Sequence, residues 1–373
     1  MRIVLVAGAR PNFMKIAPII RAIDRHNTSE QGDFIEPALV HTGQHYDYEM
    51  SKVFFEDLEL PEPDIYLGVG SGTHAEQTGK TMIEIEKVLI KETPDLVVVV
   101  GDVNSTLAGA LAAAKLNIAI AHVEAGLRSF DREMPEEINR LLVDAISDYL
   151  FTHSPDADEN LKKEGIPHEK IFFVGNVMAD SLLYNKPKAE HYRTLDRFGL
   201  NKENYALLTL HRPSNVDVRE SMLNIVRALA QISQELPIIF PAHPRTQQRL
   251  KEFDLLNQLP SSSHQFLLIE PLSYLDFLNL EIAARFVMTD SGGIQEETTV
   301  LGIPCLTLRN TTERPITISQ GTNTLVGNDT EAIVREALKI LAGEGKEGNC
   351  PELWDGKAAE RIVRVLSPKG AGI

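Results

Sequence analysis

The stretch HVEAGLRSFDREMPEEINR, residues 122–140, contains side chains that could move protons or could simply form a charged surface. It holds five carboxylates and three arginines in nineteen residues. His122 and Glu124 stand two apart at the end of a predicted strand, so we expect both side chains to project from the same face of the sheet. An ionisable pair is costly to bury without a purpose. Glu124 is therefore a candidate for acid–base chemistry.

The second half of this stretch predicts the start of a helix. Pro135 suits the first helical position, and an apolar stripe would anchor the helix: Ile138, Leu141, Leu142, Ala145 and Ile146. Glu136 can reach Arg140 four residues on, in an exposed pair worth only about 0.3–0.5 kcal/mol. Spacing alone leaves Glu136 open between an ordinary first-turn glutamate and an acid–base group. The intervening SFDREM, residues 129–134, is predicted to be a solvated or mobile loop that covers the ligand.

Two turns that follow predicted strands are candidate phosphate sites. GARPNFMKIAP, residues 8–18, puts Arg10 and Lys15 at a helix start, where free N–H groups and positive charge suit a phosphate. TDSGGIQEE, residues 289–297, has two glycines that would let a diphosphate approach the backbone, and Glu297 could accept hydrogen bonds from ribose hydroxyls. A solvated turn would also explain the first motif. Capping by Asp290 or Ser291 would also explain the second, and there both interpretations can hold together.

The elements that must position these residues alternate between apolar runs of strand length and segments of helical periodicity. The runs are RIVLVA, EPALVHT, DLVVVVGD, IAIAHVEA and KIFFVGN, followed by YALLTLH, PIIFPAH, FLLIEP, RFVMTD and PCLTLR. Runs that are apolar throughout are typical of parallel sheets covered by helices on both faces. The sequence therefore predicts an α/β protein with two doubly wound domains, and the 373 residues suffice for both.

Polar clusters follow the strand ends in both halves. They are GDVNST (101–106), LHRPSN (210–215), AHPRT (242–246) and NTTERP (310–315). Each alone could be a cap or a turn. Because doubly wound sheets bind ligands beyond the carboxyl ends of their strands, the whole set indicates a ligand in the cleft between two domains.

Composition excludes several function classes. A net charge of -16 argues against nucleic-acid and anionic-membrane partners. Two cysteines, Cys305 and Cys350, fit a reducing cytoplasm, and no apolar run reaches the length of a membrane span. Eleven histidines form no metal-ligand pattern, and GARPN replaces a dinucleotide fingerprint after the first strand. We therefore expect a cytoplasmic protein without metal or cofactor.

Taken in order, the motifs resemble the UDP-N-acetylglucosamine 2-epimerase family over nearly the whole chain. They are GARP with Lys15, GD (101–102), HVEAGLR (122–128), PEE.NR (135–140), LHR (210–212), DSGGIQEE (290–297) and TERP (312–315). The resemblance implies a GT-B fold: two Rossmann-like doubly wound parallel-sheet domains with the active site in the interdomain cleft. Strand character is lost within residues 170–200, so we expect an N-terminal domain at 1–177 and a nucleotide-binding domain at 178–354. The resemblance adds a C-terminal helix over about 355–373 that joins the first domain. It also implies a homodimer.

The resemblance implies a non-hydrolysing enzyme that interconverts UDP-GlcNAc and UDP-ManNAc by elimination of UDP to 2-acetamidoglucal and re-addition. The implied catalytic residues are Asp102, Glu124, Glu136 and His211. The implied substrate-binding residues are Arg10, Lys15, Phe277, Ser291, Gly292, Gly293, Glu297 and Arg314. A second UDP-GlcNAc bound as an activator would contact Gln44, His45, Arg212 and His243.

The chain departs from the family pattern at positions that bear on the sugar. It reads GARPN where GTRPE is common, and Val103, Leu272 and Ile316 replace threonine, glutamine and glutamate. These departures leave the sugar substituents open, so the substrate could instead carry a modified sugar such as a 2,3-diacetamido uronate. The chain could also be a hydrolysing 2-epimerase or a GT-B glycosyltransferase. The carboxylate that removes the C2 proton and the glycan pathway that uses the product stay open as well.

Overall fold

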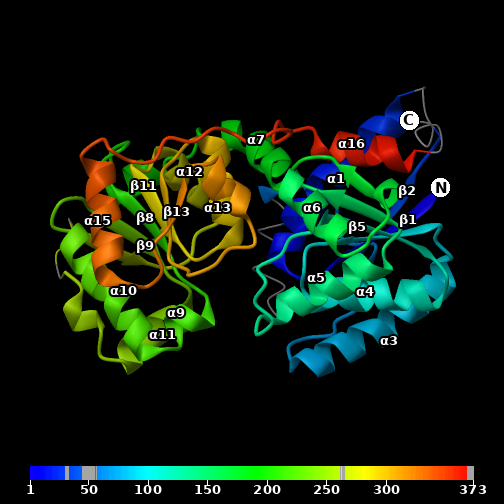
Figure 1. The fold of residues 1–373 in the computed structure, drawn as a ribbon, viewed down its shortest axis with the longest axis horizontal. Coiled ribbons are helices and arrows are strands. Elements are labelled where there is room, and N and C mark those ends of the chain that lie inside the picture. The colour runs from blue at the N-terminus through cyan, green and yellow to red at the C-terminus, as the bar shows by residue number, and fades with distance from the viewer. Residues whose placement is uncertain (30–32, 44–54, 56, 261, 263–264, 368–373) are drawn as a thin grey trace. The chain divides into compact units, whose positions relative to one another are not determined.

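The computed structural model describes residues 1–29, 33–43, 55, 57–260, 262 and 265–367, and it divides the chain into two compact units. Unit 1 comprises Met1–Tyr184 and Glu352–Ile373, and unit 2 comprises Asn185–Pro351. Helix α7 (Val177–Ala189) carries the chain from the first unit into the second. Figure 1 shows the elements of each unit.

Unit 1 is built on a parallel sheet that has seven strands in the part of the chain described. The strands are β1 (Arg2–Ala7), β2 (Glu36–His41), β3 (Ile65–Tyr66), β4 (Leu96–Val100), β5 (Ala119–Ala125), β6 (Tyr149–Thr152) and β7 (Ile171–Phe173). Their spatial order is β3-β2-β1-β4-β5-β6-β7. The chain therefore winds outward from β1, returns to β4 and winds the other way, so the topological switch point lies between β1 and β4.

Helices cover both faces of this sheet (Figure 1). They are α1 (Arg10–Thr28), α3 (His74–Glu92), α4 (Asn104–Lys115), α5 (Pro135–Ile146), α6 (Pro155–Lys163) and α16 (Ala358–Leu366), with a 3-10 turn η1 (His168–Lys170). Val4, Val6 and Val99 face α4, where they pack on Leu107 and Ala110. Helix α1 lies on the opposite face. Burial on both faces explains why these strands are apolar throughout.

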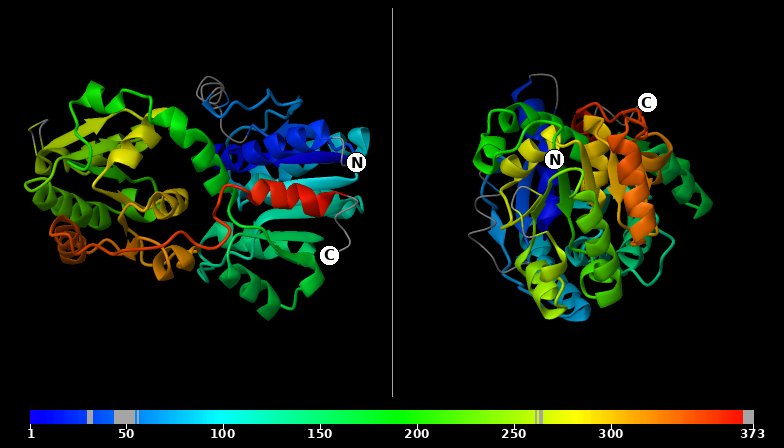
Figure 2. Two further views of the ribbon diagram at one scale, coloured as in Figure 1. Left: turned by 90° about the horizontal axis from the view of Figure 1, so that it is seen from above. Right: turned by 90° about the vertical axis from the view of Figure 1, so that its left-hand side faces the viewer.

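The C-terminal segment of the chain returns to unit 1 (Figure 2). Helix α16 packs on α1, and the Trp354 indole donates a hydrogen bond to the carbonyl of His153 at 2.9 Å. The carboxylate of Asp180 on α7 accepts the amides of Ala358 and Ala359 and so caps α16. Burial raises the pKa of Asp180 to about 6. The last helix is thus part of the first unit although the second unit precedes it in sequence.

Unit 2 repeats the winding with a parallel sheet of six strands among the described residues, in the order β10-β9-β8-β11-β12-β13. The strands are β8 (Ala206–Thr209), β9 (Ile238–Pro241), β10 (Phe266–Ile269), β11 (Phe286–Thr289), β12 (Cys305–Thr307) and β13 (Asn323–Leu325). The switch point lies between β8 and β11.

Two layers of helices enclose the sheet of unit 2. The helices are α8 (Thr194–Phe198), α9 (Pro213–Val216), α10 (Arg219–Ile232), α11 (Pro244–Glu252), α12 (Tyr274–Ala283), α13 (Gly292–Leu301), α14 (Pro315–Ser319) and α15 (Thr330–Leu341), with a 3-10 turn η2 (Leu256–Gln258). Leu208, Phe240 and Met288 pack against α10 and α15 on one face. Leu207 and Val287 pack against α12 and α13 on the other.

The prediction of an α/β protein with two doubly wound parallel sheets, the GT-B class, is confirmed. All ten runs predicted to be strands are strands, while the short strands β3, β6 and β13 were not predicted. In the described part of the chain, no helix combines the length and the apolar character needed to cross a membrane.

Candidate active site

Most candidate residues lie beside a switch point. In unit 1, Lys15 belongs to the helix after β1, Asp102 follows β4, and Glu124 is the last but one residue of β5. In unit 2, His211 follows β8 and Ser291 follows β11. Because the carboxyl ends of parallel strands share one edge of a sheet, each set gathers at the edge where such sheets bind ligands.

Glu124 occupies a strained and buried position at the end of β5. Its φ is +74°, a left-handed conformation that is unusual for a residue with a side chain, and the register with β6 shifts between Val123 and Ala125. Its carboxylate forms an ion pair with the ammonium of Lys15, and both side chains are less than a tenth exposed. Such strain concentrates at functional sites. The bulge turns this carboxylate onto helix α1.

The prediction that His122 and Glu124 project from one face of β5 is wrong. His122 contacts Asp144 of α5 at 2.6 Å, whereas Glu124 contacts Lys15 of α1, and these helices cover opposite faces of the sheet. The bulge at Glu124 breaks the two-residue alternation on which the prediction rested. His122 is fully buried between Asp144 and the carbonyl of Gly101 at 2.9 Å. The ring is thus held at both of its nitrogens.

Asp144 is the centre of a buried ion-pair network beneath β5. Its second oxygen accepts the amide of Gly126 at 3.0 Å and pairs with Arg128 at 2.7 Å. Arg128 also binds Glu164 in a two-pronged contact. Burial opposes ionisation of Asp144, but His122 and Arg128 outweigh it and keep the pKa of Asp144 below its usual range. His122 and Arg128 therefore fix the backbone on either side of Glu124.

Glycine at position 101 allows the end of β4 to approach the Lys15–Glu124 pair. Its φ is +65°, and a Cβ there would lie 2.8 Å from the Lys15 ammonium and 3.3 Å from a Glu124 oxygen. Asn12 closes the same turn, because its side chain accepts the amides of Gly8 and Ala9 and donates to the carbonyl of Val100 at 3.0 Å. The turn after β1 is thus held tightly beside the turn after β4.

Helix α5 begins at Pro135 as predicted, but most of the predicted apolar stripe is not buried, although Ile146 packs against the core. Leu142 is 46% exposed, Ala145 is exposed, and Ile138, Leu141 and Ile146 are only half-buried. The buried residues are instead Glu137, Asn139, Arg140, Val143 and Asp144. The helix turns a polar face inward because ion pairs and hydrogen bonds satisfy each buried polar group there.

Arg140 connects α5 to Asp102, which follows β4. Its guanidinium pairs with Asp102 and with Glu137, the latter at 2.6 Å, and the Asn139 amide donates to the Asp102 carbonyl at 2.8 Å. Arg140 is 1% exposed, whereas the Asp102 side chain is 25% exposed. The prediction that Arg140 forms an exposed pair with Glu136 is therefore wrong for Arg140, which is buried. Arg140 instead orients the carboxylate of Asp102, which solvent or a ligand can reach.

Glu137 also anchors the loop over residues 129–134. Its carboxylate accepts the amides of Ser129 and Phe130 at 3.0 and 2.9 Å. Burial opposes its ionisation, but the bonds from Ser129 and Arg140 prevail and lower the pKa of Glu137. The loop is solvated at its tip as predicted, since Phe130 is 77% exposed, but its base is fixed. Glu136, next to this anchor, lies half-buried in the first turn of α5.

In unit 2, His211 and Asp290 form an imidazole–carboxylate pair across the switch point. The His211 Nδ1 lies 3.0 Å from a buried oxygen of Asp290, and the backbone amides of His211 and Arg212 donate to the same carboxylate. Asn215 donates to it as well. Burial opposes ionisation, but the bonds from His211 prevail and lower the pKa of Asp290. An imidazole held through Nδ1 turns Nε2 outward, and the His211 side chain is half exposed.

The start of helix α13 places the backbone of Gly292 and Gly293 beside a nearby arginine, while the Ser291 amide donates to the Thr289 hydroxyl at 2.9 Å. Ser291 is the N-cap residue without a capping side-chain bond, and Asp290 binds His211 instead of capping. A Cβ on Gly292 would overlap the Arg314 guanidinium, so glycine permits this close approach. Arg314 pairs with Glu296 at 2.8 Å and with Glu313. The geometry suits an anion, through N–H groups at a helix N-terminus and a buried cation.

Glu313 balances the arginines around this helix. It contacts Arg314, Arg309 at 2.7 Å and Arg212 at 3.9 Å. Burial opposes its ionisation, but Arg314 and Arg309 hold the pKa of Glu313 well below its usual range. A carboxylate among three guanidiniums keeps them in place and limits their net positive charge.

Of the remaining predicted binding residues, some are described by the structure and others are not. Glu297 is buried on α13 and accepts the Tyr274 hydroxyl at 2.9 Å, and Phe277 is half-buried on α12. His243 is exposed and accepts the amide of Arg245 at the start of α11. Gln44 and His45 lie outside the described residues, and only the backbone of Arg10, the first residue of α1, is described.

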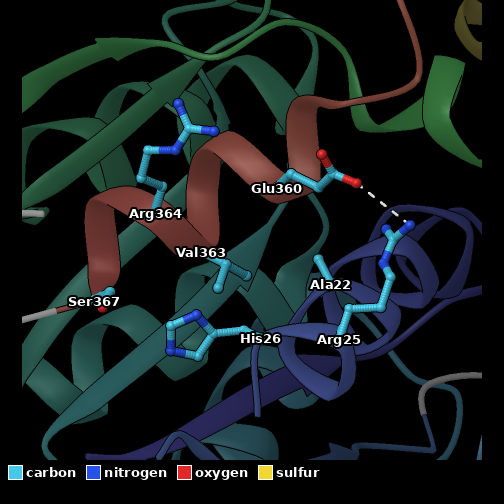
Figure 3. A pocket seen from close by; sticks show the side chains of 7 residues that line it. All are labelled: Ala22, Arg25, His26, Glu360, Val363, Arg364 and Ser367. Carbon is cyan, nitrogen blue, oxygen red and sulfur yellow. Dashed lines mark ion pairs between the residues drawn. The ribbon is translucent and has the colours of Figure 1, made fainter. Parts of the chain in front are cut away.

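A cavity of about 360 Å³ in unit 1 is separate from these residues. It lies between α1 and α16 and is lined by Ala22, Arg25, His26, Glu360, Val363, Arg364 and Ser367 (Figure 3). Glu360 already pairs with Arg25 at 3.3 Å. None of the predicted site residues lines it.

Sequence reasoning missed the residues that orient the candidate catalytic and binding side chains. The sequence indicates Asp290 only as a cap, and it gives no sign that Asn12, Glu137 and Arg140 orient their neighbours. The adjacent ends of β8 and β11 could have identified the contact of Asp290 with His211, because a Rossmann-like order makes those strands neighbours. The contacts of Arg140 had no comparable signal, since the apolar pattern of α5 indicates the wrong face.

The two doubly wound units place the chain in the GT-B class of α/β proteins. A family model described as UDP-N-acetylglucosamine 2-epimerase matches residues 27–367. The UDP-N-acetylglucosamine 2-epimerase of Methanocaldococcus jannaschii is 49% identical over 98% of this chain and 99% of its own. The chain belongs to the UDP-N-acetylglucosamine 2-epimerase family.

Two further similarities refine this membership. The crystal structure of the M. jannaschii enzyme in complex with UDP-GlcNAc and UDP covers 98% of this chain and 99% of its own, with a TM-score of 0.88 and 49% identity. A UDP-2,3-diacetamido-2,3-dideoxy-D-glucuronate 2-epimerase of Pseudomonas aeruginosa is 41% identical over 98% of this chain and 99% of its own. The protein is therefore an epimerase of nucleotide sugars.

Proposed function

We propose that this protein is a non-hydrolysing UDP-GlcNAc 2-epimerase that interconverts UDP-GlcNAc and UDP-ManNAc. The observation that carries the proposal is the left-handed, buried Glu124, aimed at Lys15 beside Asp102 at the switch point of unit 1. In unit 2, an imidazole–carboxylate pair lies beside a glycine-rich helix start. The relative bound to UDP-GlcNAc and UDP supports the same substrate.

The C2 proton of the sugar is adjacent to no carbonyl and is therefore not acidic. Its removal needs a base placed beside C2, and a carboxylate can be that base. We infer that the C1–O bond breaks with its electrons leaving on UDP, while a carboxylate takes the C2 proton and a C1=C2 double bond forms. UDP then adds back to C1 after a proton reaches C2 from the other face. Proton transfer by oriented side chains is typically worth about 10²–10⁴-fold in rate.

We assign this proton transfer and the stabilisation of positive charge at the sugar to Asp102, Glu124 and Glu136. Arg140 orients Asp102, and Lys15 balances the buried charge of Glu124. The main role that we assign to Lys15 is therefore to stabilise the charge of Glu124. A contact of Lys15 with a phosphate would be a second role.

We assign the departing diphosphate to unit 2. His211 protonates or hydrogen-bonds the leaving oxygen through Nε2, because Asp290 holds its Nδ1. The Ser291 hydroxyl, the amides of Gly292 and Gly293, and the guanidiniums of Arg314 and Arg10 would bind the phosphates. Loss of one oriented donor at developing charge typically costs about 10²–10³-fold.

We also propose that the enzyme works as a cytoplasmic homodimer in polysaccharide biosynthesis. Cysteine content supports the reducing compartment: Cys305 is buried and Cys350 is exposed, and neither is in a disulfide. Ile83 and Ile90, two turns apart on α3, are 54% and 61% exposed and offer an apolar strip to a second copy. Light scattering of the wild type and of Ile83→Glu tests the dimer, which the variant should weaken.

A second candidate is 2-epimerisation of a 2,3-diacetamido uronate nucleotide, favoured by the P. aeruginosa relative. Incubation with UDP-GlcNAc alone in D2O, followed by NMR, separates the candidates. Deuterium at C2 and a mixture of UDP-GlcNAc and UDP-ManNAc support the main proposal. Free sugar indicates a hydrolysing enzyme. No change points to a modified sugar or to a glycosyltransferase, and the same experiment with the diacetamido uronate nucleotide distinguishes these two.

A further inference from the structure

Unit 2 buries two glutamates against each other without a cation. Glu281 is fully buried on α12, and Glu297 is 4% exposed on α13. Their carboxyl groups form a hydrogen bond with each other. Within the described residues, neither forms an ion pair with a lysine, arginine or histidine. Two carboxylates without a cation would repel strongly in such a site.

The contacts around the pair show which group holds a proton. Glu297 accepts the hydroxyl of Tyr274 at 2.9 Å, so Glu297 is an acceptor. Among the described residues, neither oxygen of Glu281 has a hydrogen-bond partner besides this contact with Glu297. Two carboxyl groups can bond only if one of them is protonated. A negative charge is therefore better placed on Glu297, which the Tyr274 hydroxyl stabilises, and the shared proton belongs on Glu281 as a neutral carboxylic acid.

We propose that Glu281 is a positioning residue, whose neutral carboxylic acid donates to Glu297 and, together with Tyr274, fixes the orientation in which Glu297 receives the ribose hydroxyls of a uridine nucleotide. Tyr274 and Glu281 lie seven residues apart on α12, two turns along one face, so one helix presents both donors. This inference rests on the proposed function for the identity of the nucleotide. The protonation of Glu281 does not depend on it.

The surroundings keep the proton in place. Burial, followed by the charge of Glu297, raises the pKa of Glu281 well above its ordinary value. Burial raises the pKa of Glu297 to about 7, and the bond from Tyr274 limits the rise. Three further titratable groups face the pair: Glu296 lies near Glu297, whereas Tyr205 and Cys305 lie near Glu281. None of these three groups is a cation, so none of them favours a second negative charge.

A raised carboxyl pKa has a definite effect on stability. The folded state holds these protons more tightly than the unfolded chain, so their stabilising effect is complete below the unfolded pKa near about 4.3. It is lost as pH rises through the folded pKa values. Glu281→Gln keeps a donor and the size of the side chain but carries no proton to lose. Its melting temperature relative to the wild type should therefore rise with pH.

The test compares Glu281→Gln with Glu281→Leu, which has no donor. UDP binding is measured by calorimetry at pH 7, and melting temperature is measured between pH 5 and pH 9. We expect Glu281→Leu to weaken UDP binding about tenfold, as for one lost hydrogen bond to a charged group, and Glu281→Gln to restore most of the affinity. The melting temperature of Glu281→Gln minus that of the wild type should rise by about 3 °C or more.

Glu313→Gln is a matched control, because Glu313 is equally buried but lies among arginines that keep it ionised. Its melting-temperature difference should stay flat over the same pH range. The positioning role is overturned if the Leu and Gln variants of Glu281 bind UDP equally, whether both weakly or both strongly. It is also overturned if the wild type does not bind UDP. A flat pH profile for Glu281→Gln overturns the neutral acid. Failure of sugar turnover affects the proposed function alone, since neither measurement requires turnover.

Discussion

Gly101→Ala should impair catalysis through the Lys15–Glu124 pair while changing stability little more than an ordinary glycine replacement. Gly101 has a φ of +65°, where alanine costs roughly 1–2 kcal/mol, partly offset by a stiffer unfolded chain worth about 0.4–1 kcal/mol. The new methyl group would lie 2.8 Å from the Lys15 ammonium. The end of a flexible lysine can move away, so the steric penalty to stability is small.

The penalty to the reaction is larger, because the movement occurs where Glu124 is held. An ordinary contact of about 3.4 Å requires a displacement of about 0.6 Å of the ammonium, and Glu124 at 3.3 Å is crowded too. A misplacement of about 1 Å can cost about 10²-fold in rate. We therefore expect kcat to fall roughly 10- to 100-fold, with UDP affinity nearly unchanged because unit 2 is untouched.

Gly165→Ala provides the matched control in the same unit. Gly165 has a φ of +84°, and a Cβ there meets nothing within 4 Å, so this variant bears the backbone cost alone. Thermal unfolding and initial rates of epimerisation are measured for both variants. Similar melting temperatures with a rate loss only in Gly101→Ala support the reasoning. Equal rates in the two variants would refute it.

Three further predictions address the rest of the site. The amide variants of the three carboxylates should each lose most turnover but keep UDP binding, and near-full activity in any one removes that residue from the mechanism: Asp102→Asn, Glu124→Gln and Glu136→Gln. Gly292→Ala should weaken UDP binding about tenfold by displacing Arg314, although alanine normally favours a helix by about 1 kcal/mol; unchanged calorimetric affinity would contradict this. Asp290→Asn should lower turnover at least about 10²-fold by releasing His211. Because the pKa of Asp290 is lowered, its contribution to stability is present above the unfolded pKa and is lost as pH falls. The melting-temperature deficit of Asp290→Asn should thus shrink toward pH 3, and a constant deficit would argue against an ionised Asp290.

The fold was predictable because its strands are buried on both faces. Runs such as DLVVVVGD have no other common explanation than a covered parallel strand, and β4 confirms it. The strands that were missed, β3, β6 and β13, are only two to four residues long. Length alone does not explain the misses, because β7 and β12 have three residues each and were predicted. The missed strands are determined by pairing with a neighbouring strand of the sheet.

The site was predictable only where strand ends determine it. The position of Glu124 after β5 follows from the sequence, but its left-handed conformation and its turn toward Lys15 depend on a bulge that no local pattern indicates. Helix α5 is the clearest failure. Its apolar residues predict one buried face, and the ion pair of Arg140 with Asp102, which is far away in sequence, selects another.

Cleavage of the bond between the sugar and UDP is the central claim, and oxygen-18 placed in the oxygen that joins C1 to the diphosphate tests it most directly. The enzyme is incubated with labelled UDP-GlcNAc, and the position of the label is followed by phosphorus NMR. If UDP leaves and re-adds, the label spreads into non-bridging positions of the β-phosphate at least as fast as the 2-epimer forms. A 2-epimer formed with all the label still in the bridge would contradict the account.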